Sequence, residues 1–341
     1  MTPARSFALF FLAVMTLSLL ALLPVLQPAH AQEAASTQGK GWPRTIRHEA
    51  GTLTLEAPPK RVISTTPSVT GILLAINAPV ISSAATTASI LTDDKGFFSQ
   101  WAQVADERDV SVLYKSLKFD MEAVIGANPD LVVVSATGAD NATPYYDELV
   151  AQGIPTIVVN YSNHLWQQLA TQLGEATGKE QDAQAAIDRF NTYAAEVAAT
   201  LAPPQTPATI VGYNLGGSYS IARPESPHAR LLTALGFSLA GLPNELSSQV
   251  TRRSDFDFIS RENLTAAIGG ETVFLLNGTD ADVEAFLADT VLANLPAVKK
   301  RQVYPLGPTS FRIDYYSGRQ MIDAVARHFH APCCAPWDRR D

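Results

Sequence analysis

The side chains best suited to chemistry in this 341-residue sequence are concentrated near its C-terminal end. The segment Ser310–Ser317, with the sequence SFRIDYYS, carries an arginine, an aspartate and two tyrosines within eight residues. It follows a predicted strand and precedes a predicted helix, which is where α/β proteins commonly bind ligands. An arginine there can hold an anion or stack on an aromatic ring, whereas catalysis would need a nucleophile with a base beside it.

The sequence contains none of the motifs that usually identify an enzyme. The glycine-rich stretch GYNLGGSYS does not fit the G-x-G-x-x-G pattern, and there is no P-loop, G-x-S-x-G or H-E-x-x-H. His48, His164 and His228 are isolated from one another in the sequence. We therefore predict no catalytic residues, and we interpret the C-terminal cluster as part of a binding site.

Further arginines and tyrosines occupy predicted loops in the second half of the chain, whereas the first half offers mainly hydroxyl groups. Arginine supplies both positive charge and a stacking plane, so several arginines and tyrosines around one cleft would suit a large anionic aromatic ligand. The predicted ligand-binding residues are Arg312, Arg223, Arg252, Arg253, Tyr213, Tyr219 and Tyr315 from the second half, with Thr66 and Thr87 from the first.

The elements that position these residues follow from the hydrophobic pattern. Short runs rich in Val and Ile are continuous rather than alternating, which is typical of strands buried on both faces of a parallel sheet. In the first half they cover residues 61–65, 79–84, 130–136 and 155–160. Thr66 is placed to cap a helix that begins at Pro67, so the end of a strand and the start of a helix meet there.

Between the two halves, apolar residues recur at steps of three and four from Ile187 to Leu201, which predicts one long amphipathic helix. We therefore predict an α/β fold of two Rossmann-like lobes with mainly parallel sheets, joined by one long rigid helix. The predicted parts are a signal peptide over 1–31, an N-terminal lobe over 42–176, a linker helix over 177–202, a C-terminal lobe over 207–330 and a flexible tail over 331–341.

Two similar segments within the sequence support the prediction of two lobes. Residues 120–138 and 260–278 share a capping residue, a glutamate two positions later, an apolar helix, a buried strand and a final glycine. One interpretation of Glu122 and Glu262 is a favourable charge in the first helical turn, worth about 0.3–1 kcal/mol. The other is a symmetric docking pair, read by a partner with arginine-lined sockets at matching spacing.

The N-terminal segment indicates export. Arg5 precedes an apolar run from Phe7 to Leu23, and Ala29 and Ala31 have the spacing of a signal-peptidase site. The run is longer than the usual hydrophobic region, so an uncleaved membrane anchor is the alternative. We predict cleavage near Ala31 and no membrane insertion afterwards.

The charge balance and the cysteines limit the partners further. A formal net charge of −8 argues against nucleic acid and anionic membranes as partners. Cys333 and Cys334 are adjacent in the C-terminal tail and cannot form a disulfide framework. With His328 and His330 they make only a loose cluster, and a metal site needs three or four ligands in fixed geometry. We predict no metal ligands and no cofactor.

Several stretches resemble one known family, the ferric enterobactin periplasmic binding proteins, which are the substrate-binding components of catecholate-siderophore ABC importers. The resemblance extends from about Trp42 to Phe329. The stretches that carry it are RVISTTPSVTGILLAINAPVISSAATT, DDKGFFSQWAQVADER, PDLVVVSATGADNA, ATQLGEATG, TVLANLPAV and SFRIDYYS.

The resemblance implies roles for individual residues. Glu122 and Glu262 would dock onto the inner-membrane permease, and Arg312 would meet the anionic ferric catecholate. The basic pair Arg252 and Arg253 falls where relatives also carry positive charge. The sequence departs from the family pattern at residues 89–91, where a basic residue would be expected, and at residues 222–223, where an aromatic would be expected.

The function that the resemblance implies is capture of a ferric catecholate siderophore in the periplasm and its delivery to the permease. One alternative keeps the fold and changes the ligand to heme, cobalamin or a hydroxamate siderophore. Heme would require an axial ligand, for which Tyr213, Tyr219 and His228 lie in suitable loops. Another alternative is an exported enzyme such as a siderophore esterase, although no serine lies at a recognisable nucleophile elbow.

Overall fold

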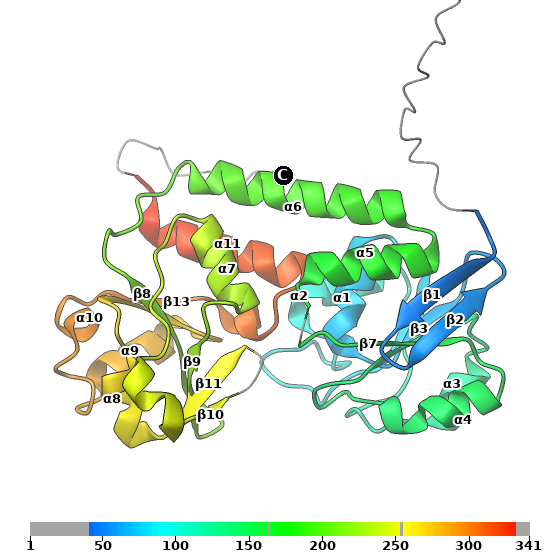
Figure 1. The fold of residues 1–341 in the computed structure, drawn as a ribbon, viewed down its shortest axis with the longest axis horizontal. Coiled ribbons are helices and arrows are strands. Elements are labelled where there is room, and N and C mark those ends of the chain that lie inside the picture. The colour runs from blue at the N-terminus through cyan, green and yellow to red at the C-terminus, as the bar shows by residue number, and fades with distance from the viewer. Residues whose placement is uncertain (1–40, 163, 253–254, 332–341) are drawn as a thin grey trace, which may run out of the picture. The chain divides into compact units, whose positions relative to one another are not determined.

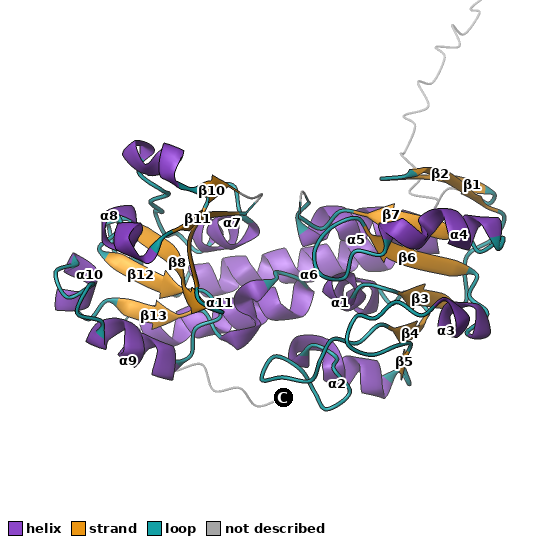
Figure 2. Cartoon of the chain, turned by 90° about the horizontal axis from the view of Figure 1, so that it is seen from below, coloured by secondary structure: helices purple, strands orange, loops and turns teal. Residues whose placement is uncertain are grey.

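The computed structural model describes residues 41–162, 164–252 and 255–331, which all belong to one compact unit. The predicted signal peptide, Arg253 and tail residues 332–341, with both cysteines, lie outside the described residues. Figure 1 shows the order of the elements along the chain, and Figure 2 shows that the two sheets lie in separate lobes.

The N-terminal lobe is built on a five-stranded sheet whose neighbouring strands are all parallel, in the order β5-β4-β3-β6-β7. Four strands match the predicted apolar runs. The structure adds the short strand β5 and an antiparallel hairpin, β1-β2, which the sequence pattern did not predict. The strands are β1 (Arg44–His48), β2 (Gly51–Leu55), β3 (Val62–Ser64), β4 (Val80–Ser83), β5 (Ser111–Val112), β6 (Leu131–Ser135) and β7 (Thr156–Val159).

Helices connect these strands. Pro67 occupies the first turn of α1 as predicted, but the Thr66 side chain makes no capping hydrogen bond; Asp140 accepts from the Ser68 N–H of the first turn and from the Thr66 hydroxyl. Asp120 caps α3 by accepting from the Ala123 N–H. The helices are α1 (Pro67–Ala75), α2 (Ser99–Glu107), α3 (Met121–Gly126), the 3-10 turn η1 (Thr143–Tyr145), α4 (Tyr146–Ala151) and α5 (Trp166–Thr177).

The long helix between the lobes, α6 (Glu180–Ala198), is shorter at both ends than the predicted 177–202. Gly178 adopts the left-handed conformation with φ 71° and ends α5, so α6 starts only at Glu180. At the other end the chain leaves the helix to pair with the end of the last helix, where the Ala202 N–H donates to the Phe329 carbonyl at 2.8 Å.

The C-terminal lobe contains a six-stranded sheet in the order β10-β11-β9-β8-β12-β13. Its strands are β8 (Ala208–Leu215), β9 (Ser218–Ala222), β10 (Thr251–Arg252), β11 (Phe256–Ile259), β12 (Thr272–Leu275) and β13 (Val303–Pro305). Only β8, β12 and β13 pair in parallel, whereas β8, β9, β11 and β10 pair antiparallel. The expected βα series is therefore interrupted by a hairpin, whose turn is formed by Asn214, Gly216 and Gly217 with positive φ. Parallel pairing still prevails over the two sheets together.

The helical elements of this lobe end with α11, the last helix of the described chain. They are α7 (Pro227–Ala234), η2 (Asn244–Gln249), η3 (Arg261–Asn263), α8 (Leu264–Ala267), α9 (Asp280–Ala288), α10 (Pro296–Lys299), η4 (Pro308–Phe311) and α11 (Tyr315–Phe329). The N-cap of α11 is Asp314, which accepts from the Tyr316 and Ser317 N–H groups at 2.8 Å, and Ser317 is the second member of this capping box.

Helix α11 joins the two lobes, because it belongs to the C-terminal lobe and packs on α1, α2 and α6. One hydrophobic core runs through this contact and includes Leu73, Trp101, Met321 and Phe274. The packing is close, since a Cβ atom added at Gly71 in α1 would lie 2.6 Å from Asp314 Oδ2 and 2.8 Å from the Trp101 ring. The absence of a side chain at this position therefore allows α11 to approach α1.

Replacing Gly71 with alanine tests this contact. We expect Gly71→Ala to lower the free energy of unfolding by about 1–3 kcal/mol, because neither the buried carboxylate nor the indole can move away. Gly126→Ala is the matched control, since its added Cβ would meet no atom within 4 Å. Chemical denaturation of both variants provides the measurement, and equal stability of the two variants would contradict close packing at Gly71.

Candidate ligand-binding cleft

The two lobes face each other across a polar pocket of about 390 Å³. The N-terminal lobe contributes the segment that follows β7 and the start of α5, and the C-terminal lobe contributes the segment between β9 and α7 together with Asp255. Its lining residues are Ser162, His164, Leu165 and Gln168 from the first lobe and Arg223, Glu225, Pro227, Arg230 and Asp255 from the second. We call this pocket, with the deeper recess described next, the interlobe cleft.

Arg312 lies in the deeper recess of the cleft, among residues from both lobes. Its guanidinium carbon is 4.3 Å from the centre of the Tyr161 ring, which belongs to the other lobe, and its Nη1 is 3.6 Å from Asp255 Oδ2. The second distance is too long for a hydrogen bond. The Nε atom is buried and has no hydrogen-bond partner within the described residues. This arginine therefore retains donor capacity toward an anion.

Tyr161 is held in position by a buried carboxylate. Its hydroxyl donates to Asp140 at 2.6 Å, and Asp140 also accepts from the Thr66 hydroxyl at 2.6 Å and the Ser68 N–H at 3.2 Å. Burial raises the pKa of Tyr161, and the neighbouring Asp140 raises it further. The phenol therefore stays protonated near neutral pH, and its ring presents a fixed surface to Arg312.

His228 supports the segment that carries Arg312. Its Nε2 lies 2.6 Å from the Ser310 carbonyl, so the neutral ring donates a hydrogen bond there, and Nδ1 has no partner within the described residues. Burial lowers the pKa of His228 to about 4, and the positive charge of Arg312 also lowers it. The buried ring is therefore neutral and orients the backbone two residues before Arg312.

The other predicted arginines differ in their positions. Arg223 lines the cleft, where its Nη2 is 3.6 Å from Glu225 Oε2. Arg252 does not line it, and its Nε donates to Asp257 at 3.0 Å within the β10-β11 hairpin. Arg230, which the sequence reasoning did not single out, lines the cleft from α7. The structure thus brings Arg312, Arg223 and Arg230 to one region.

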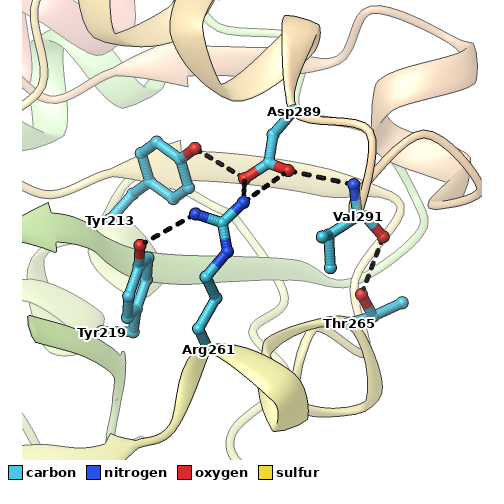
Figure 3. A network of polar contacts seen from close by, with 6 residues as sticks. All are labelled: Tyr213, Tyr219, Arg261, Thr265, Asp289 and Val291. Atoms are coloured by element: carbon cyan, nitrogen blue, oxygen red, sulfur yellow. Dashed lines mark hydrogen bonds and ion pairs between the residues drawn. The ribbon is translucent and has the colours of Figure 1, made fainter.

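Two of the predicted tyrosines belong to a polar network in the C-terminal lobe (Figure 3). The Tyr213 hydroxyl donates to Asp289 at 2.8 Å, and Arg261 reaches the same carboxylate at 2.9 Å and the Tyr219 hydroxyl at 3.5 Å. Burial raises the pKa of Tyr213 to about 12, and Asp289 adds to the shift. Neither tyrosine lines the interlobe cleft as the described residues define it.

The remaining predicted ligand residues are placed as follows. Tyr315 packs edge-on against Trp166 and near Phe190 on the helical side of the lobes. Burial alone would raise the pKa of Tyr315, but hydrogen bonds and positive charge from Arg189 and Arg319 outweigh it and lower the pKa. Thr66 is buried with its hydroxyl donated to Asp140, and Thr87 is exposed in the loop after β4. Their contact with a ligand stays a prediction.

Glu122 and Glu262 are exposed in the first turn of corresponding helical elements. Hydrogen bonds to its own backbone N–H and to Ser260 lower the pKa of Glu262, so this group is a carboxylate at neutral pH. The two turns are built differently. The first belongs to a capped helix, α3, whereas the second is the 3-10 turn η3, which has no side-chain cap and is braced by the Arg261–Asp289 pair (Figure 3).

Sequence reasoning missed residues in the cleft and behind it. Tyr161 lies in the recess two residues after β7, and Asp140, which binds its hydroxyl, lies five residues after β6, so a position that follows a strand end was the signal that could have identified them. Asp255 lies in a loop without a recognisable pattern, and its closeness to Arg312 depends on the fold alone. Within residues 41–162, 164–252 and 255–331, there is no group of three His, Cys, Asp or Glu side chains able to hold a metal and no helix suited to crossing a membrane.

Comparison with known proteins identifies the class. The family model described as periplasmic binding protein matches residues 62–309, and this chain belongs to that family. It is 42% identical over 299 residues to the ferric enterobactin-binding periplasmic protein FepB of Escherichia coli O6:H1, with 86% of this chain and 93% of the relative covered. The resemblance seen in the sequence is thus confirmed.

Solved structures agree with this assignment. The crystal structure of holo-ViuP is 41% identical, with a TM-score of 0.77, and the match covers 86% of this chain and 97% of that one. SirA of Staphylococcus aureus, solved in complex with staphyloferrin B, is 19% identical with a TM-score of 0.63. The match covers 84% of this chain and 99% of the SirA chain. The second match supports the two-lobed α/β fold only.

The buried histidine predicts a pH dependence of stability. The folded pKa of His228 lies below the ordinary value of 6.5, so between pH 6.5 and about 4 the unfolded chain binds the extra proton. The free energy of unfolding should therefore fall as the pH falls through this window, by at most about 3 kcal/mol from this residue. His228→Gln should make the loss shallower.

Urea unfolding of wild type and His228→Gln at a series of pH values measures this difference. Burial raises the pKa of Asp314, which has the opposite effect on stability, but Asp314 is common to both proteins and cancels in the comparison. Parallel curves for the two proteins between pH 6.5 and 4 would show that His228 is not buried in its neutral form.

Proposed function

We propose that this protein is an exported receptor that binds a ferric catecholate siderophore in the periplasm and delivers it to an inner-membrane ABC permease. Two observations support the ligand. A relative with 42% identity is a ferric enterobactin-binding protein, and the interlobe cleft contains an arginine with a buried, unpartnered N–H. The second carries most of the argument, because it belongs to this chain.

The charges of the cleft suit a trianionic complex, as a ferric tris-catecholate is. Arg223, Arg230 and Arg312 approach one region from the C-terminal lobe. The ion pairs of Arg223 with Glu225 and of Arg312 with Asp255 are both 3.6 Å long, which is longer than a hydrogen bond. A hydrogen bond to a charged group contributes about 1.5–3 kcal/mol.

Binding of ferric enterobactin to the mature protein, followed by quenching of intrinsic fluorescence, tests the proposed function. We expect Arg312→Ala to weaken the affinity by about tenfold or more, because one charged hydrogen bond and the stacked cation are lost. Arg301→Ala is the control, since Arg301 is exposed and paired with Glu284 away from the cleft residues. No tight binding of any ferric catecholate by the wild type would refute the proposal.

The structure gives little support to heme as the ligand. His228 is buried with Nε2 engaged by Ser310, and the hydroxyls of Tyr213 and Tyr219 face Asp289 and Arg261. An axial ligand from these three would have to give up those contacts. Competition between hemin and ferric enterobactin, read at the Soret band, separates the two ligands directly.

Delivery to the permease would use Glu122 and Glu262 as a docking pair. Both are exposed, and both lie in a first helical turn at matching positions of the two similar segments. A pseudo-symmetric permease could therefore bind both carboxylates simultaneously. The braced η3 turn fits this role, since a fixed carboxylate loses less conformational freedom on binding. The same proposal includes removal of the signal peptide near Ala31 and the absence of catalytic activity.

The double variant Glu122→Ala with Glu262→Ala should bind ferric enterobactin as the wild type does and should support iron uptake about tenfold less well, because both charge contacts to the permease are lost. Glu56→Ala with Glu284→Ala is the control, with one exposed glutamate from each lobe. Uptake into proteoliposomes that contain the importer is the measurement. Weaker binding in solution by the first variant would instead place these residues in the cleft or the fold.

A further inference from the structure

A second pocket, of about 310 Å³, lies in the N-terminal lobe at the ends of its strands and is distinct from the interlobe cleft. Its most prominent feature is an aromatic stack, in which the rings of Phe119 and Tyr145 lie 4.0 Å apart and within 6° of parallel. Tyr145 is 39% exposed, which is unusual for a large aromatic ring. Tyr114 packs behind Phe119 at 5.6 Å and fixes it. We call this pocket the aryl slot.

A lysine lines the aryl slot. Lys118 is exposed, and its ammonium group makes no ion pair or hydrogen bond within the described ranges, in a chain whose formal net charge is −8. The loop that presents it is unusual, because Ser116 and Leu117 both adopt the left-handed conformation, with φ 55° and 54°. Leucine rarely does so unless the surroundings enforce it, and such strain is found preferentially at ligand sites.

The aryl slot and the interlobe cleft share a wall. Asp140 lines the slot, and the same carboxylate accepts a hydrogen bond from the Tyr161 hydroxyl. The Tyr161 ring in turn stacks on the Arg312 guanidinium group in the cleft. The negative charge of Asp140 is met by three donors, the hydroxyls of Thr66 and Tyr161 and the N–H of Ser68. Its repulsion of an anion in the slot is thereby reduced. One multi-armed ligand could therefore contact both regions.

We propose that the aryl slot receives one anionic aryl arm of the ligand, with the ring packed on the exposed face of the Phe119–Tyr145 stack and its oxygens paired with Lys118. This inference rests on the proposed function and adds to it a contact surface from the N-terminal lobe. The residue types fit, since stacked aromatic rings extend favourably to a third ring and an unpaired ammonium group attracts a phenolate oxygen. A ligand that lacks aryl arms would not engage this slot.

Affinity measurements on four variants of the mature protein test the proposal, with ferric enterobactin as the probe. We expect Lys118→Ala and Tyr145→Ala each to weaken binding by about five- to tenfold, through loss of the charge and of the stack. Lys115→Ala is the matched control, because Lys115 is an exposed lysine of the same loop that does not line the slot. Tyr145→Phe keeps the ring, and both this variant and Lys115→Ala should stay within about twofold of the wild type.

The outcomes separate this inference from the proposed function. Tight binding by the wild type, with Lys118→Ala and Tyr145→Ala unchanged, overturns the aryl slot and leaves the proposed function standing. No binding by the wild type overturns both. If the two variants bind normally but lower uptake, the pocket belongs to the docking face near Glu122, which also overturns the inference. Thermal unfolding of each variant verifies that a loss of affinity is not a loss of fold.

Discussion

The structure depends on the contact that helix α11 makes with the opposite lobe. Its N-cap, Asp314, is fully buried, and desolvation raises the pKa of this carboxyl group. Hydrogen bonds from the Tyr316 and Ser317 N–H groups offset this cost, and the Gln100 side chain of α2, in the N-terminal lobe, lowers the pKa in the opposite direction to burial. The carboxylate also packs closely on Gly71 of α1, so moving one lobe would remove contacts that this buried group makes with the other.

This contact also determines where the cleft arginine lies. Arg312 precedes the cap of α11 by two residues, and the Ser317 hydroxyl donates to its backbone carbonyl at 2.6 Å. His228 holds the Ser310 carbonyl on the other side. With its backbone fixed from both sides, the guanidinium group stacks on Tyr161 and keeps one N–H unpaired. Interactions that stabilise the lobe contact thus also preorganise the proposed ligand contact, which lowers the entropic cost of binding.

The two lobes contain similar segments, residues 120–138 and 260–278, but they are stabilised by different means. The sheet of the first is wholly parallel, whereas in the second a hairpin places three antiparallel strands beside β8. As a result, Tyr213 and Tyr219 lie on adjacent antiparallel strands, where their hydroxyls form hydrogen bonds with Asp289 and Arg261. The network braces the turn that carries Glu262 and gives both tyrosine hydroxyls partners within the lobe, and contact of these tyrosines with a ligand stays a prediction.

The sequence by itself determined the alternation of strands and helices, the buried parallel strands of the first lobe and the helix between the lobes. These features depend on neighbouring residues, through hydrophobic period, capping and proline or glycine positions. The role of Arg312 was implied by the family resemblance of its segment. Only the tertiary structure decided that Arg312 meets Tyr161 and Asp255, that Thr66 is used by Asp140 and that Tyr315 packs on Trp166. Partners so far apart in the chain leave no periodic trace, because side-chain geometry, and not local pattern, selects them.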